Sequence, residues 1–104
     1  MGVLVSATKL MYLTGARHDL EYQIDLINTS KANILSSINT MIPNGADMEP
    51  DSPEVKLLEQ RKQRLMLIDK KLDQDLIHAQ TKLDALKAEE QQVSRKLQEQ
   101  TQKA

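Results

Sequence analysis

Few residues of this chain are suited to metal binding or to acid–base chemistry. There are two histidines, His18 and His78, and no cysteine. Structural zinc sites usually take four Cys or His ligands at short, regular spacings, and neither histidine has a second such ligand one helical turn away. Both also fall outside the apolar repeat described below. We therefore expect two separate, exposed histidines and no metal site.

Acidic residues form a second candidate group between residues 47 and 51. Asp47, Glu49 and Asp51 alternate in the manner of calcium ligands. An EF-hand loop that starts at Asp47 would need glycine at its sixth position and glutamate at its twelfth, where the chain has Ser52 and Leu58. We expect a solvated acidic loop.

Carboxylates also recur after residue 68, at Asp69, Asp73, Asp75 and Asp84. Paired carboxylates act as acid and base where a pocket raises one pKa, and a straight helix offers no such pocket. Lysines alternate with these acids, which is typical of a solvent-exposed helix face. The chain also lacks a glycine-rich phosphate loop and a G-x-S-x-G nucleophile motif. We therefore predict a non-catalytic protein with no catalytic residue, no cofactor and no small-molecule substrate.

The apolar residues before residue 42 recur in alternating steps of three and four. The repeat includes Leu10, Leu13, Arg17, Leu20, Ile24, Ile27, Lys31, Ile34, Ile38 and Met41. Such a repeat keeps one stripe of a helix facing a partner helix, as in a coiled coil. We call this stripe the seam and predict a helix over residues 3–42. Gly15 lies outside the seam, and a helix that breaks near Gly15 and folds its first part onto the second helix is the alternative.

A second seam follows the cluster of Pro43, Gly45 and Pro50, which predicts a loop over residues 43–52. Ser52, Pro53 and Glu54 form a strong helix-start signal. The seam then includes Val55, Leu58, Lys62, Leu65, Asp69, Leu72, Leu76, Ala79, Leu83, Leu86, Glu90, Val93 and Leu97. We predict a helix over residues 53–101.

Two long helices with a short polar connection should fold back on each other. We therefore predict an all-α fold, an antiparallel helical hairpin with coiled-coil packing, as a single domain over residues 1–104. Placing Ile42 level with Glu54 sets residue n of the first helix beside residue 96 − n, at about 1.5 Å per residue, and leaves the second helix unpaired beyond Val93.

Five seam positions carry charge: Lys62 and the four that we expect to set the register, Arg17, Lys31, Asp69 and Glu90. Polar seam residues lower stability but can select one register and one partner. In the expected register Lys31 and Asp69 lie about one turn apart. Either they form a partly buried pair that selects the register, or each side chain reaches water separately.

Several large apolar residues of the first helix lie off its seam: Leu4, Met11, Tyr12, Tyr22 and Leu26. Met66, Leu67 and Ile77 do so on the second helix. Single exposed apolar residues are normal, but the five on the first helix share one broad side. We predict that this side is an interface with a protein partner or with a second copy.

Ser6, Lys9, Leu13-Thr14, Asp19-Leu20-Glu21-Tyr22-Gln23 and Ile27-Asn28 form an opening that resembles a group of short, uncharacterised bacterial proteins. Their openings read roughly S-x-x-R-x-x-x-L-T, then D/N-x-E-Y-Q and I-N. The second helix is similar at Asp69, Leu72-Asp73, Leu76 and Val93. The resemblance implies a bacterial source and adds no activity.

Charge and composition indicate which partners and which cellular location to expect. With 14 basic and 15 acidic residues the net charge is −1, which disfavours a nucleic-acid partner. The chain shows neither a basic n-region nor a long apolar run, so we expect a cytoplasmic protein, with signal-peptide-independent secretion left open. The leading hypothesis is a small adaptor or assembly subunit that acts through helix–helix contacts. The alternatives are a component or chaperone of a bacterial secretion or flagellar export system, and a peripheral membrane protein anchored by its apolar N-terminus.

Overall fold

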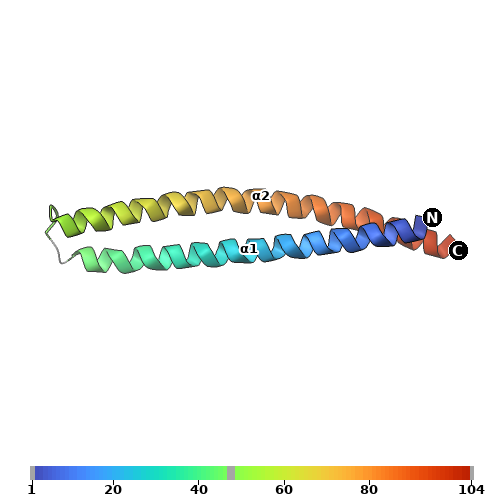
Figure 1. Cartoon of the computed structure of the whole chain (residues 1–104), viewed down its shortest axis with the longest axis horizontal. Helices are drawn as coiled ribbons and strands as arrows, with labels where there is room; N and C mark the ends of the chain where they lie inside the picture. Colours follow the sequence, from blue (N-terminus) through green and yellow to red (C-terminus); the bar gives the residue numbers. More distant parts are fainter. Residues whose placement is uncertain (1, 47–48, 104) are drawn as a thin grey trace. The chain divides into compact units, whose positions relative to one another are not determined.

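The chain forms two long helices that pack against each other (Figure 1). The computed structural model describes residues 2–46 and 49–103. Helix α1 spans Gly2–Ala46 and helix α2 spans Pro53–Lys103, and the described residues include no strand. The predicted all-α helical hairpin is therefore confirmed.

Helix α2 begins at the capping residue that its sequence indicates. The Val55 amide donates to Ser52 Oγ at 3.2 Å, and the Lys56 amide donates to the Ser52 carbonyl at 3.1 Å. Pro53 occupies the first helical position, where its missing amide proton costs nothing. Glu54 in the first turn and Lys103 in the last turn complement the helix dipole.

Helix α1 is continuous through Gly15, so the alternative with a break at that residue is wrong. One interior glycine costs about 1 kcal/mol relative to alanine, which seam packing on both sides of Gly15 readily offsets. The helix also ends later than predicted, at Ala46 instead of residue 42. Proline inside a helix removes one backbone hydrogen bond and crowds the carbonyl four residues earlier, yet α1 continues for three residues past Pro43.

The predicted loop over 43–52 is correspondingly shorter. Residues 47 and 48, and with them Asp47 of the acidic group, lie outside the described residues. Before α2, the Ser52 amide donates to the Glu49 carbonyl at 3.0 Å and closes a turn. The second helix continues to Lys103, two residues past its predicted end.

The burial pattern follows the predicted seams closely. Every seam position of α1 and of α2 is buried or half-buried, and nearly all positions between them are exposed. Ser6, one heptad before Leu13, is a buried polar residue at the same helical position, which the sequence alone did not single out. The apolar repeat therefore identifies which side of each helix faces the other.

Contacts divide the hairpin into two compact units, Met1–Asp25 with Ile77–Ala104, and Leu26–Leu76. The first unit holds the buried core, namely Leu13, Ala79, Leu83 and Val93. In the second unit the described seam residues are half-buried, and three of them, Lys31, Lys62 and Asp69, are charged. Apolar burial is thus concentrated in the first unit.

The register differs from the expected one. Glu90 contacts Thr14, and Lys31 contacts both Asp69 and Asp73. These pairs place residue n of α1 beside residue 103 − n of α2, about one heptad further along than predicted. A shift of one heptad leaves every seam position facing a seam, so the apolar pattern alone could not distinguish the two registers.

The shifted register changes two further expectations about the first unit. Gly2 lies beside Gln100, so α2 is paired well beyond Val93. In the expected register of 96 − n, His18 would lie level with His78; in the observed register it lies level with residue 85, and both histidines are exposed. These two residues therefore do not face each other across the hairpin.

Candidate functional site

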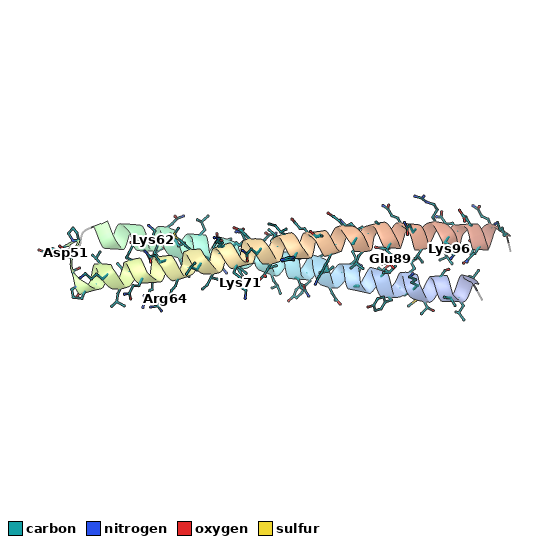
Figure 2. The ribbon with its side chains drawn as sticks, turned by 90° about the horizontal axis from the view of Figure 1, so that it is seen from above. Asp51, Lys62, Arg64, Lys71, Glu89 and Lys96 are labelled. Carbon is teal, nitrogen blue, oxygen red and sulfur yellow. The ribbon has the colours of Figure 1, made fainter. Side chains whose placement is uncertain are left out.

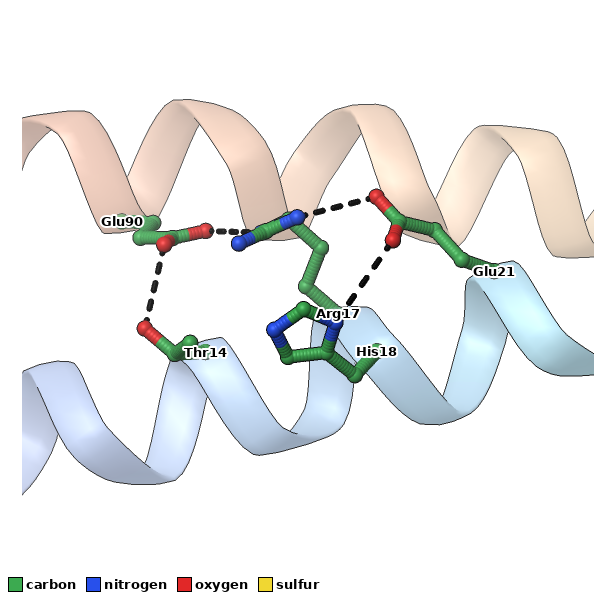
Figure 3. A network of polar contacts seen from close by, with 5 residues as sticks. All are labelled: Thr14, Arg17, His18, Glu21 and Glu90. Atoms are coloured by element: carbon green, nitrogen blue, oxygen red, sulfur yellow. Dashed lines mark hydrogen bonds and ion pairs between the residues drawn. The ribbon is translucent and has the colours of Figure 1, made fainter.

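Arg17 is the centre of a polar cluster inside the first unit (Figure 3). Its Nε donates to Glu90 Oε2 at 2.7 Å, and its Nη1 donates to Glu21 Oε1 at 3.0 Å. Thr14 Oγ1 donates to the other Glu90 oxygen at 3.1 Å. The side chains of Arg17 and Glu90 are only 24% and 20% exposed, so the pair is partly shielded from water.

Hydrogen bonding shifts both ends of this pair toward the charged form. The bond from Arg17 lowers the pKa of Glu90 below its ordinary value of 4.5, and the bond from Thr14 adds to this effect against partial desolvation. Hydrogen bonds to Glu90 and then to Glu21 raise the pKa of Arg17. Both residues are therefore ionised in the folded chain at neutral pH.

The lowered pKa of Glu90 predicts a specific dependence of stability on pH. A carboxylate with a lowered folded pKa stabilises the fold above its unfolded pKa and loses that contribution as the pH falls through the folded value. We expect the difference in unfolding free energy between wild type and Glu90→Gln to be largest at neutral pH and to shrink below pH 4.5. Urea titrations followed by circular dichroism at several pH values measure it. Arg17→Gln should remove the same dependence, and a difference that stays constant into acid would contradict the pairing.

Lys31 forms the corresponding cluster in the second unit. Its Nζ donates to Asp69 Oδ1 at 3.0 Å and also to Asp73 Oδ1. Hydrogen bonds to Asp73 and then to Asp69 raise the pKa of Lys31. The contact between Lys31 and Asp69 that the sequence left open is therefore present, and the register-selecting role of the pair stays a prediction.

A double-mutant cycle tests whether Lys31 and Asp69 are energetically coupled. We expect Lys31→Met and Asp69→Leu to be non-additive in urea denaturation, because each variant removes the other residue's partner. The coupling should increase in an Asp73→Ala background, where the ammonium group has one acceptor left. Lys31→Met combined with Glu54→Gln is the additive control. Zero coupling in both backgrounds would mean that the two side chains reach water independently.

The structure adds three polar partners to the clusters around Arg17 and Lys31: Thr14, Glu21 and Asp73. Each lies three or four residues from a charged seam residue of its own helix. Helical neighbours at these spacings lie on one face, so a search for polar side chains one turn from each charged seam residue would have found them. The expected register placed Lys31 level with Leu65, so Asp73 was too far along α2 to be expected as its partner.

The predicted interface residues are all exposed. Leu4, Met11, Tyr12 and Tyr22 belong to the first unit and are 65–76% exposed. Leu26 belongs to the second unit and is about half exposed. We call the side of α1 that carries Leu4, Met11, Tyr12, Gly15 and Tyr22 the outer face, because it lies opposite the seam. No atom lies within 4 Å of the point where a Cβ of Gly15 would be.

Helix α2 carries both charged and apolar exposed side chains (Figure 2). Charged residues such as Arg64, Lys71 and Lys96 are exposed along this helix. Leu67 and Ile77 are exposed apolar residues of α2, one in each unit.

The second unit has an open, largely apolar groove of about 320 Å³. Ile34, Leu35, Ile38 and Met66 line it, and Lys31 and Asp69 also border it. The exposed side chains of Leu35 and Met66 were not among the predicted interface residues.

The described residues form neither a cluster of metal ligands nor a membrane-crossing helix. Within 2–46 and 49–103, no three acidic or histidine side chains come close enough to hold a metal ion. In the same ranges, neither α1 nor α2 has a stretch both apolar and long enough to cross a bilayer.

No family model, curated protein or solved structure matches this chain. The outer face and the two polar clusters are the features of the described chain that bear on its function.

Proposed function

We propose that this chain is a small, non-catalytic coiled-coil protein that acts through helix–helix contacts, with the outer face of α1 as its contact surface. The exposure of Met11, Tyr12 and Tyr22 on one side of a helix is the observation that carries the proposal. Single apolar residues are common on surfaces, but several large ones on one side of a helix are typical of an interaction site. Tyrosine in particular is enriched at interfaces, because its ring packs while its hydroxyl stays hydrated.

The two polar clusters support an interaction role. They supply hydrogen-bonded pairing between α1 and α2 within each unit without using the outer face. The outer face is therefore presented on a helix whose opposite side is already packed. The proposal also includes a cytoplasmic location and, from the resemblance of the sequence, a bacterial source.

Photocrosslinking in cells tests the proposal by position. A photoreactive phenylalanine analogue at Tyr12 should give discrete protein adducts, whereas the same group at Leu67, which is 69% exposed on α2, should give few. Equal adducts from both positions, or none from Tyr12, would contradict a contact surface on α1. The masses of the adducts show whether the partner is a second copy or another protein, such as an export component.

A vesicle assay distinguishes the membrane alternative. The wild-type chain should stay in the supernatant when vesicles of phosphatidylcholine and phosphatidylglycerol are pelleted. Sedimentation with the vesicles that is abolished by Leu4→Glu would assign the apolar side chains to lipid instead of to protein.

A further inference from the structure

The outer face carries its own repeat, distinct from the seam. Leu4, Met11, Gly15 and Tyr22 are separated by steps of seven, four and seven. These steps keep the four residues on one side of α1, away from α2. Within the first unit, α1 therefore has one seam that is covered and a second row that is not.

Resting on the proposed function, we propose that the partner is a second copy of this chain, whose α1 packs antiparallel on the outer face with Met11 of each copy over Gly15 of the other. A two-fold axis beside residue 13 makes this contact twice, because each copy supplies both the large and the small side chain. The same axis sets Leu4 of each copy opposite Tyr22 of the other. The two Tyr12 rings then lie next to each other at the axis.

Gly15 is the observation that points to a second helix. A glycine inside a helix is less favourable than alanine, and here nothing within the described chain occupies the space beside it. No positive φ occurs at any described glycine, so Gly15 is not needed for a turn. A small residue between Met11 and Tyr22 allows another helix to approach closely and gives the Met11 side chain a place to pack.

Charge complementarity favours the antiparallel orientation. Lys9 and Asp19 flank the same edge of the outer face and both are exposed, and Lys9 Nζ also lies 3.5 Å from Glu89 Oε1 on α2. In the antiparallel arrangement Lys9 of one copy lies about two residues along the axis from Asp19 of the other, on the same side of the interface. A parallel two-fold arrangement would place Lys9 of one copy and Asp19 of the other on opposite sides of the interface and ten residues apart along the axis, so they could not pair.

The available area is of the order that a stable dimer needs. Two largely exposed tyrosines can bury roughly 300 Å² per copy, and Leu4, Val5 and Met11 are also exposed. A standard interface buries about 800 Å² per partner. The outer face of the first unit therefore supplies a substantial part of that area without any contribution from Leu26.

Disulfide trapping of the full chain tests the arrangement, because the natural sequence has no cysteine. Under mild oxidation, Tyr12→Cys should link to itself. Leu4→Cys and Tyr22→Cys should link to each other when the two proteins are mixed, and only weakly when each is alone. Leu67→Cys, on exposed α2, gives the collisional background. If Leu4→Cys and Tyr22→Cys each link to themselves as strongly as Tyr12→Cys does, the antiparallel orientation is wrong. If no variant links more than Leu67→Cys does, the proposal that the partner is a second copy is wrong.

Gly15→Gln tests the close approach separately from folding. The new side chain enters open space in the single chain and improves helix propensity, so helical content should be retained and the thermal midpoint should not fall. In the dimer it meets Met11 of the other copy, so the yield of the Tyr12→Cys link should drop by about tenfold or more. An unchanged yield would overturn the contact with Gly15. Position-specific photocrosslinks from Tyr12 to a different protein, without any disulfide link, would reject the second copy and leave the proposed function standing.

Discussion

Replacing Leu13 with alanine should lower the free energy of unfolding by about 2–5 kcal/mol, as for other buried leucines. Leu13 is 3% exposed, less than any other hydrophobic core residue of the described chain, and it belongs to the unit that holds the buried core. Small domains are stable by only about 5–15 kcal/mol, so the variant should lose a large part of its folded population on mild heating. Urea denaturation followed by circular dichroism measures the change.

Leu67→Ala is the matched control, because it removes the same atoms from an exposed position on α2. Its effect should stay within about 0.5 kcal/mol. If Leu13→Ala and Leu67→Ala lower the free energy of unfolding equally, the seam of the first unit is not the core of the hairpin.

Arg17→Glu should be the most damaging single change at a polar position. The variant places three carboxylates together, because position 17 lies between Glu21 and Glu90. Both of these residues also lose the guanidinium group of Arg17 as a partner. Like charges in a partly shielded site repel strongly, and each also keeps the cost of its own desolvation. We expect a marked fall in the urea midpoint at neutral pH, which should be partly recovered in acid as the carboxylates become protonated.

The exchanged pair Arg17→Glu with Glu90→Arg is the control for this prediction. It restores opposite charges at the same two positions and should regain much of the lost stability, although Glu21 then stands beside a carboxylate. If the exchanged pair is no more stable than Arg17→Glu alone, the contact between Arg17 and Glu90 does not stabilise the hairpin.

The sequence was sufficient for the architecture, because heptad spacing is a local property of each helix. The steps from Leu10 to Met41 and from Val55 to Leu97 predict which side of each helix is covered, and burial agrees at every one of those positions. The start of α2 could also be predicted, because a serine before Pro-Glu can accept a hydrogen bond from an amide of the first turn, as Ser52 does.

The register could not be predicted from the apolar pattern, because a shift of one heptad replaces each seam residue by another seam residue. Charged positions break this degeneracy. In the register expected from the sequence, Arg17 would lie level with Ala79, and Glu90 would be about three helical turns away. In the observed register Arg17 reaches Glu90 directly. Pairing the seam charges before fixing the turn would have favoured the observed alignment.

The outer face could be identified as apolar from the sequence, but its exposure depended on whether α1 continues through Gly15. A break there would have folded the first part of α1 onto α2 and covered Leu4 or Met11. Propensity alone could not decide this, because the cost of one glycine is small compared with the packing of the flanking seam residues. The continuous helix leaves the outer face open in the single chain.

Sedimentation equilibrium at micromolar concentrations tests most directly whether the outer face of α1 makes the association. The wild-type chain should have twice its monomer mass of 11.8 kDa. Met11→Glu with Tyr12→Glu should sediment as a folded monomer, and Leu67→Glu, on α2, should match the wild type. A folded wild-type monomer at tens of micromolar, or a dimer that persists in the Met11 and Tyr12 variant, would contradict association through this face.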